Sequence, residues 1–362
     1  MIVQTEELKQ IVKHMLNVYD KSSVYDVERN IRLQWDADEL IVSAFNINQH
    51  LRIKVSISAN DAGDILVDPA FLYNLLSTLG EVTKITENNL KLSLSSGNSK
   101  LKMSGLSTEF WPEWLGHVGD EVEVPWEEMK LYCQQATIVS RHNHDFPVKS
   151  GIFFTRKVED DPEDKTEWLE LVSADGHRLL SRIFQTKNGS QFNRFIIPGP
   201  DLISVKDVFD VSETVRMIVG EKITWFAGNN AEFSITHLDG SIPAYEPLIN
   251  MEPESEATVC RDDILRAINQ ANMYARAAND EFLPCYIEMV DNGIRVTNDD
   301  GMDTLVPATT IGDTFKIKMT PGMALEVIRN TREDDIKIWH TKKLVAIYIQ
   351  TSDSLFITMG RA

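Results

Sequence analysis

The sequence has few cysteines and no long apolar run, and each shortage excludes a class of protein. The cysteines, Cys133, Cys260 and Cys285, are far apart and odd in number. They therefore form neither a disulfide framework nor a paired-cysteine metal site, and we expect buried free thiols. No apolar stretch approaches the roughly 18 residues that a membrane-spanning helix needs. The first residues carry acids and lysines instead of the apolar block of a secretory signal, so we expect a soluble, cytoplasmic protein.

Positive charge is also scarce. The chain has 36 lysines and arginines against 55 aspartates and glutamates, which gives a formal net charge of −19. This balance argues against a protein that grips nucleic acid with a basic surface. Any contact with DNA must therefore depend on something other than strong attraction to phosphate.

What the sequence does contain is an internal repeat. A short strand followed by a helix with proline in its first turn occurs in segments 64–80, 194–210 and 315–331. Proline is favoured there because the amide that it lacks would have no partner in the first turn. Asp68 and Thr320, just before two of these prolines, are predicted to be N-caps. Alternating apolar and polar residues, typical of half-buried strands, follow each helix.

A second amphipathic helix precedes each of these segments. Apolar side chains recur at helical spacing in residues 5–20, 125–141 and 260–276. The chain thus reads as three units of roughly 120 residues each. We predict domains 1–119, 120–252 and 253–362. In each, two helices should pack on one face of an antiparallel sheet, so the fold class is α+β.

Three tandem units with their helices on one side would form a curved array with a helical inner face. If the array curves enough, two chains can close a ring through a head-to-tail contact.

Several segments carry a family resemblance. "GIFFTRKVEDDPEDKTEWLELVSADGHRLLSRIF" begins at Gly151, "THLDGSIPAYEPLI" at Thr236 and "SLFITMGRA" at Ser354. The "ADGHRL" run and the DG-x-x-P-x-Y segment, Asp239–Tyr245, are the most specific. In order, length and threefold organisation the chain resembles the bacterial DNA polymerase III beta subunit, the beta sliding clamp.

The resemblance implies a fold and a function. It implies three tandem clamp domains with antiparallel sheets outside and helices inside, in a head-to-tail homodimeric ring that encircles duplex DNA whatever its sequence. It also implies that a clamp loader opens the ring, that the ring tethers the replicative polymerase and other DNA-processing proteins, and that the chain has no catalytic activity and no cofactor.

The run Asp175–Arg178 has two further interpretations besides the one that the family implies. Asp175, His177 and Arg178 could supply an acid, a base and an anion clamp. However, neighbours on a hairpin point to alternate faces and no nucleophile motif accompanies them. Asp-Gly between alternating runs is a strong hairpin signal, so a plain structural turn is the second alternative. The resemblance implies that this turn lines a pocket for short linear peptides.

The resemblance also implies which residues line that pocket. They are Lys149, Ala174, Gly176, His177, Arg178, Leu179, Pro243, Leu248, Ile357, Met359 and Arg361. Lys149 stands where the family usually has an apolar residue, Pro247 stands where a basic one is common, and the last four residues also depart from the family. We therefore expect a different peptide preference. Two or three apolar anchors, at roughly 1.5–3 kcal/mol each less ordering costs, predict affinities near micromolar.

A ring needs only an inner surface that does not repel DNA, because topology prevents escape and weak phosphate contacts permit sliding. The cations expected near DNA are Lys9, Lys13, Lys21, Lys130, Arg141, His142, Lys206, Arg266, Arg276, Arg329 and Arg332. For each, the alternative is a solvated surface charge. No metal site is expected.

The dimer contact is the last site that the resemblance implies. Leu101 and Met103 of one subunit would face Met273 and Tyr274 of the other; the alternative is that all four belong to the core. Two other functions remain as alternatives: a clamp-fold scaffold that does not encircle DNA, and an acidic α+β hydrolase that uses Asp175, His177 and a cysteine.

Overall fold

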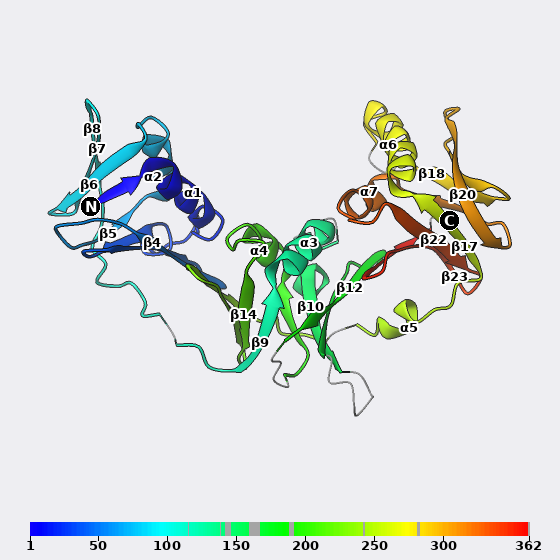
Figure 1. The fold of residues 1–362 in the computed structure, drawn as a ribbon, viewed down its shortest axis with the longest axis horizontal. Coiled ribbons are helices and arrows are strands. Elements are labelled where there is room, and N and C mark those ends of the chain that lie inside the picture. Colours follow the sequence, from blue (N-terminus) through cyan, green and yellow to red (C-terminus); the bar gives the residue numbers. More distant parts are fainter. Residues whose placement is uncertain are drawn as a thin grey trace. The chain divides into compact units, whose positions relative to one another are not determined.

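The structure is a computed structural model, and it describes residues 1–114, 116–137, 139–141, 146–158, 167–187, 192–241, 243–280 and 283–360. The chain forms two compact units (Figure 1). The first unit comprises Met1–Glu127, Lys187–Phe192 and Ser204–His237. The second comprises Glu128–Thr186, Asn193–Ile203 and Leu238–Ala362.

One series of elements occurs three times: a strand, a helix, four strands, a second helix and three strands. The first series is β1 (Ile2–Gln4), α1 (Thr5–Met15), β2 (Ile31–Trp35), β3 (Glu39–Phe45), β4 (Gln49–Ser56), β5 (Gly63–Val67), α2 (Pro69–Leu76), β6 (Val82–Asn88), β7 (Lys91–Ser96) and β8 (Ser99–Ser104). The second is β9 (Asp120–Pro125), α3 (Trp126–Ala136), β10 (Gly151–Val158), β11 (Glu167–Ala174), β12 (Arg178–Thr186), β13 (Phe195–Pro198), α4 (Gly199–Ser204), β14 (Thr214–Val219), β15 (Ile223–Ala227) and β16 (Ala231–Thr236).

The third series is β17 (Ser255–Cys260), α6 (Arg261–Ala277), β18 (Cys285–Val290), β19 (Gly293–Thr297), β20 (Asp303–Gly312), β21 (Lys316–Met319), α7 (Gly322–Arg329), β22 (Asp335–Thr341), β23 (Leu344–Gln350) and β24 (Ser354–Met359). A 3-10 turn, η1 (Pro147–Ser150), and a short helix, α5 (Glu246–Ile249), lie outside the common series. The threefold repeat and the α+β class are thereby confirmed. The domain boundaries at residues 119/120 and 252/253 stay predictions.

The first unit contains two antiparallel sheets. One has eight strands in the order β5-β2-β3-β4-β16-β15-β14-β9, and the other has four in the order β1-β6-β7-β8. Helices α1 and α2 contact each other in this unit (Figure 1). The predicted apolar stripe of the first helix is buried at Leu8, Ile11, Val12 and Met15. Burial of this stripe against the unit's core is what stabilises so short a helix.

The second unit contains one antiparallel sheet of twelve strands, in the order β13-β10-β11-β12-β24-β23-β22-β17-β20-β19-β18-β21. Strands β12 and β24, from different repeats, pair from Arg178 to Arg182 of β12, with Leu179 opposite Ile357 and Leu180 opposite Phe356. All of these side chains are buried. The β12–β24 pair is the second unit's equivalent of β4–β16 in the first unit, where Leu51 lies opposite Phe233.

The predicted N-caps have different outcomes. Asp68 precedes α2, and its side chain accepts a hydrogen bond from the backbone N–H of Phe71 at 2.7 Å. Thr320 was predicted to cap α7, and this is wrong, because the helix begins two residues later at Gly322. The Oγ1 atom of Thr320 is buried without a hydrogen-bond partner among the described residues.

The cysteine prediction is partly wrong. Cys133 and Cys285 are buried free thiols as expected, and burial raises the pKa of Cys285 to about 12. Cys260 is exposed at the end of β17.

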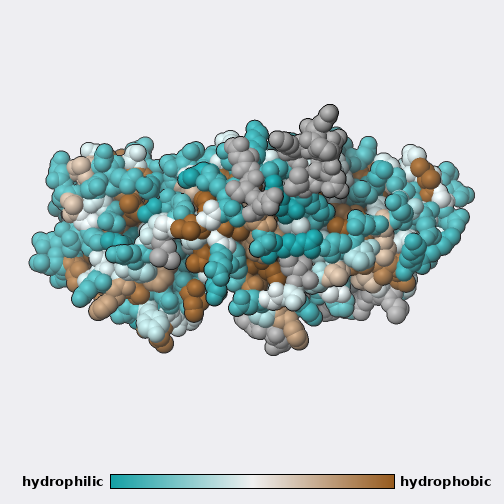
Figure 2. All heavy atoms as spheres, turned by 90° about the horizontal axis from the view of Figure 1, so that it is seen from below, coloured by the Kyte–Doolittle hydropathy of each residue, from teal (hydrophilic) through white to brown (hydrophobic). Residues whose placement is uncertain are grey.

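Figure 2 shows a face that is mainly hydrophilic with small hydrophobic patches. Within the described part of the chain, no helix combines the length and apolar character needed to cross a membrane.

Candidate functional site

The "ADGHRL" segment forms the predicted hairpin between β11 and β12. Gly176 has φ of +91°, a conformation that glycine adopts without strain. The Asp175 carboxylate accepts hydrogen bonds from the backbone N–H groups of His177 at 2.9 Å and Arg178 at 2.8 Å. It also accepts from the Arg178 guanidinium, with Nε at 2.7 Å. The carboxylate of Asp175, the acid of the catalytic alternative, is thus held by hydrogen bonds within the turn, which argues against a catalytic role.

This turn forms one side of a cavity of about 220 Å³ in the second unit. The cavity is lined by Val148, Lys149, Ala174, Gly176, His177, Arg178, Leu179, Pro243, Ala244, Tyr245, Leu248, Ile357 and Met359. Its floor includes Leu179 and Ile357, which lie opposite each other in the β12–β24 pair. The walls come from η1 and from the segment that leads into α5. Strands of two repeats therefore position the site, and a chain lacking either repeat could not form it.

The structure brings together most of the residues predicted for a pocket. Ten of the predicted residues line this cavity: Lys149, Ala174, Gly176, His177, Arg178, Leu179, Pro243, Leu248, Ile357 and Met359. Arg361 lies outside the described residues. Val148, Ala244 and Tyr245 also line the cavity and were not predicted. Tyr245 belongs to the DG-x-x-P-x-Y segment, so the sequence marked it without indicating its role.

The hydroxyl of Tyr245 is held by buried polar groups. Its side chain is 2% exposed, and its hydroxyl donates to Oε2 of Glu170 at 3.1 Å and lies 3.2 Å from Oγ1 of Thr155. Glu170 is itself buried and accepts from Nζ of Lys157 at 2.7 Å. Burial raises the pKa of Tyr245 to about 12, so the hydroxyl stays neutral and remains a donor. The part of the cavity lining that Tyr245 forms is therefore anchored by a buried polar network.

The charged groups at the rim are not equivalent. The guanidinium of Arg178 is neutralised by Asp175 within the turn. Lys149 is exposed, and its Nζ lies 4.8 Å from the centroid of the Phe146 ring. Among the residues that the structure describes, no carboxylate forms an ion pair with Lys149. The described lining thus combines an apolar interior with an arginine paired to Asp175 and a lysine that no described carboxylate pairs.

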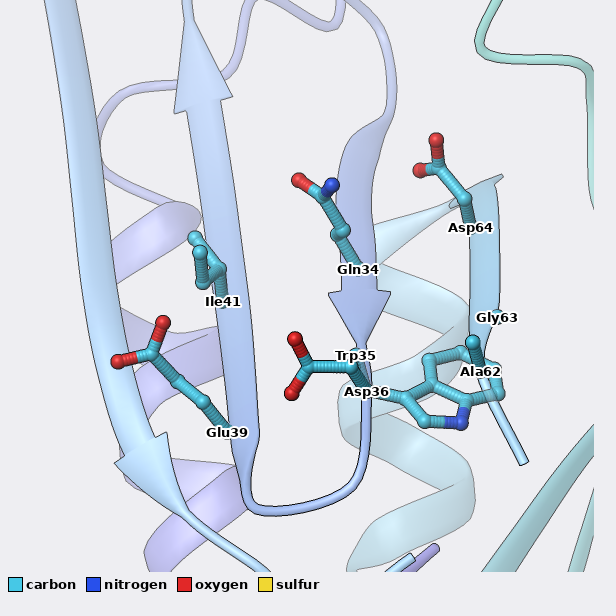
Figure 3. A pocket seen from close by; sticks show the side chains of 8 residues that line it. All are labelled: Gln34, Trp35, Asp36, Glu39, Ile41, Ala62, Gly63 and Asp64. Carbon is cyan, nitrogen blue, oxygen red and sulfur yellow. The ribbon is translucent and has the colours of Figure 1, made fainter. Parts of the chain in front are cut away.

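A second cavity, of about 390 Å³, lies in the first unit, and none of the predicted site residues lines it (Figure 3). Figure 3 shows the carboxylates of Asp36 and Glu39 on either side of the β2–β3 turn, with the Trp35 ring directed toward Gly63. The third carboxylate of this cavity lining, that of Asp64, forms an ion pair with Arg32 at 2.7 Å. Glu39 lies 3.7 Å from Nζ of Lys54. Because these acids are partly neutralised from within the fold, this cavity is the weaker candidate.

Most of the cations predicted to lie near DNA are on or beside helices. Lys9 and Lys13 are on α1, Lys130 on α3, Arg266 and Arg276 on α6, and Arg329 on α7. Lys21, Arg141, Lys206 and Arg332 follow helices, and His142 lies outside the described residues.

Several of these cations form ion pairs within the chain. The partners are Glu6 for Lys9, Asp207 for Lys206, Asp263 for Arg266 and Glu128 for Arg332. These pairs reduce the attraction that the cations can exert on phosphate.

The residues predicted for the dimer contact have different exposures. Met273 and Tyr274 are exposed on α6, so for them the alternative of a core position is wrong. Met103 is buried within the first unit, and Leu101 next to it is half-buried on β8. A contribution of β8 to an interface would therefore come from its backbone edge and from Leu101 rather than from Met103.

Known proteins resemble both the sequence and the fold. Residues 1–115 match the family model of the DNA polymerase III beta subunit, N-terminal domain. The beta sliding clamp of Bacillus subtilis (strain 168) is 21% identical over 311 residues, which cover 82% of this chain and 79% of that protein. The beta sliding clamp of Buchnera aphidicola subsp. Rhopalosiphum padi is 20% identical over 366 residues, which cover 97% of this chain and 96% of that protein.

Solved structures match along the whole chain. The DNA polymerase sliding clamp from Bacillus subtilis superimposes with a TM-score of 0.85 at 17% identity, covering 100% of this chain and 98% of that chain. The Helicobacter pylori beta clamp, crystallised with a DNA ligase peptide, superimposes with a TM-score of 0.83 at 14% identity, covering 100% of this chain and 99% of that chain. The fold of these proteins thus extends over the full length of the present chain.

Proposed function

We propose that the chain is a DNA sliding clamp, a processivity factor without catalytic activity of its own, because residues 1–115 match the family model of the DNA polymerase III beta subunit and the relatives found are beta sliding clamps. It acts as a head-to-tail homodimeric ring that encircles duplex DNA. It tethers the replicative polymerase and other DNA-processing proteins through the cavity beside the Asp175 turn. The observation that carries this proposal is an apolar cavity built between two repeats of a threefold-repeated fold.

The negative net charge of the chain is compatible with enclosing duplex DNA in a ring, and it argues against strong electrostatic binding to the phosphates. A protein that neutralises many phosphates gains affinity by releasing counterions, and it loses that affinity in salt. This chain carries a net charge of −19, and several of its helix-borne cations are paired with its own acids. In the proposed ring, domains 1–119, 120–252 and 253–362 turn their helices inward. The ring holds DNA by topology and leaves it free to slide.

The cavity supports binding of short peptides. Leu179, Leu248 and Ile357 offer apolar surface for two or three anchors, which predicts an affinity near micromolar. A related clamp, that of Helicobacter pylori, has been crystallised with a DNA ligase peptide. By analogy, segments of the polymerase, of the clamp loader and of repair proteins are the proposed occupants. Since these partners work on the chromosome or on another DNA replicon, we also propose that the protein acts in the cytoplasm.

The experiment that tests this function uses nicked circular plasmid DNA and a clamp loader with ATP. The loaded protein should co-elute with the circle in gel filtration and should be lost when a restriction enzyme linearises the plasmid. Binding that is equal on circular and linear DNA, or that needs no loader, would contradict enclosure. A protein that never associates with the circle but still binds partner peptides would instead be a scaffold.

A further inference from the structure

The cation at the rim of the cavity is the feature that the proposed function does not use. Lys149 belongs to η1 and follows directly on Val148, which also lines the cavity. Of the described residues that line the cavity it is the only lysine, and it is exposed. Its ammonium lies 4.8 Å from the centre of the Phe146 ring, and that ring is 61% exposed. A cation over an aromatic face gains little at an exposed site, so the ammonium can also bind an anion.

Two of the acids beside the described cavity lining are paired with neighbouring arginines. Asp175 is paired with Arg178 in the turn, and Glu246 on α5 is paired with Arg194 at 2.7 Å. Each of these pairs contributes no net charge. Among the described residues of the lining, Lys149 is a cation that no carboxylate pairs, although the chain as a whole carries a net charge of −19. A positive rim on an acidic protein attracts a negatively charged segment and repels a basic one.

We propose that the cavity selects peptide segments that carry a carboxylate beside their apolar anchors, and that Lys149 binds this carboxylate. The inference rests on the proposed function, because it concerns the occupant of the same cavity. One unpaired ammonium matches one negative charge. Among the described lining residues the one guanidinium is that of Arg178, and because Asp175 holds it, these residues offer no free fork of the kind that recognises phosphate with paired N–H groups. The carboxylate is either an aspartate or glutamate side chain or the terminal carboxylate of a partner.

The test measures binding of labelled synthetic peptides to the full-length protein by fluorescence anisotropy. All peptides share two leucines and a phenylalanine as anchors. One carries an internal aspartate and an amidated end, the second an asparagine and a free C-terminal carboxylate, and the third an asparagine and an amidated end. The charged residue is placed in turn at each position beside the anchors, so that the peptides sample every register in which the segment could bind. Comparison of the first two peptides distinguishes the two sources of the carboxylate.

We expect at least one charged peptide to bind roughly three- to tenfold more tightly than its neutral partner, as for a partly exposed ion pair. This ratio should fall toward one between about 50 mM and 500 mM NaCl, because salt screens exposed pairs. Lys149→Leu should bring the ratio of the two affinities to one while the neutral peptide still binds. Lys149→Glu should reverse it. The matched control is Lys343→Glu, which makes the same charge change at an exposed lysine outside the cavity lining and should keep the ratio.

The outcomes separate this inference from the proposed function. If neutral and charged peptides bind alike, or if Lys149→Leu keeps the preference, the inference is wrong while the peptide-binding function stands. If Lys343→Glu abolishes the preference as well, the effect comes from net charge and the inference is also wrong. If no peptide binds and Leu179→Asp changes nothing in any assay, the proposed function fails and the inference fails with it.

Discussion

Arg182 and Asp353 meet across the β12–β24 strand pair, with Nη1 of the arginine 2.8 Å from Oδ1 of the aspartate. Arg182 is only 1% exposed, and it also donates to Oγ of Ser354 at 2.7 Å and to the carboxylate of Glu128 on α3. Glu128 in turn accepts from Arg332 at 2.8 Å. One buried guanidinium thus connects strands of two repeats and a helix beside the floor of the cavity.

Removing one partner of this network should destabilise the second unit. Arg182→Ala leaves the Glu128 carboxylate without its closest cation and opens a void, so we expect a loss of about 3–5 kcal/mol in the free energy of unfolding. Arg182→Met fills the space without the charge and should cost less. Urea unfolding followed by circular dichroism measures both. The control Arg216→Ala removes an arginine from a surface pair with Glu121 and should change stability by less than about 1 kcal/mol. Equal effects of the two alanine variants would contradict this account.

His50 should make the first unit sensitive to acid. Burial first, and the nearby Arg52 second, lower the pKa of His50 from 6.5 to about 4. Its ring packs against Trp114, with centroids 4.4 Å apart. Between pH 4 and 6.5 the unfolded chain therefore binds a proton that the folded chain does not. The contribution of His50 to stability is complete above pH 6.5 and is lost progressively as the pH falls toward 4.

This histidine predicts a measurable pH profile. The loss at pH 4 should be no more than about 3 kcal/mol, from the size of the pKa change. His50→Gln keeps a polar side chain of similar size that does not titrate. It should flatten the dependence of the free energy of unfolding on pH between pH 4 and 6.5. His340→Gln, at a histidine whose Nδ1 lies 3.0 Å from the Ala346 carbonyl in the other unit, serves as the control and should leave the acid sensitivity in place. An unchanged profile in His50→Gln would show that carboxylates dominate the acid response.

Tyr245 provides a test of the cavity lining and of the polar network that holds it. Tyr245→Phe keeps the aromatic surface and removes the hydroxyl that donates to Glu170, so a buried carboxylate loses one donor. We expect a destabilisation of about 1–3 kcal/mol, with peptide affinity lowered by less than about tenfold because the apolar lining is retained. Denaturation and anisotropy measure the two effects. Thr224→Val removes a buried hydroxyl in the other unit and should leave peptide affinity unchanged. A full loss of peptide binding in Tyr245→Phe would mean that the hydroxyl contacts the peptide directly.

The sequence predicted those features that depend on local patterns. Asp175-Gly176 gave the hairpin because only a few residues tolerate its backbone conformation, and Asp68 with Pro69 gave the start of α2. Thr320 failed as a cap because composition does not locate the first turn of a helix within one or two residues. The polar network under Tyr245 could not be predicted. It joins Glu170, Thr155 and Lys157 through strand pairing, and the register of that pairing is a property of the folded sheet.

The strand pairs between repeats follow one rule that also predicts the dimer contact. In β4–β16 the first residue of one strand, Gln49, lies opposite the fifth residue of the other, Ile235. The β12–β24 pair has the same register, with Arg178 opposite Thr358. The corresponding strands of the third and first repeats are β20 and β8. Among the described residues, β8 pairs on one side only, with β7.

Applied to β20 of one chain and β8 of a second, this register sets Leu305 opposite Leu101. In the two observed pairs, the third residue of the first strand is a leucine, Leu51 or Leu180, and it faces a buried phenylalanine. Leu305 is also the third residue of its strand, but it is 55% exposed in the single chain. Pairing with Leu101 of a second copy would cover it, as the ring requires.

A disulfide across this contact tests both the dimer and its register. Directly opposed residues of antiparallel strands have Cα atoms about 4.5–5.5 Å apart, within the range that a disulfide spans. In a background with the exposed Cys260 replaced by serine, Leu101→Cys combined with Leu305→Cys should therefore form covalent dimers under mild oxidation. Cross-linked rings should stay on circular DNA after the loader is removed, and reduction should restore exchange. Leu101→Cys with Thr304→Cys shifts the pair by one residue to the opposite face and should cross-link far less. Equal cross-linking in both variants, or monomers only in the Leu305 variant, would contradict the register, and the dimer contact would then have to lie elsewhere on the chain.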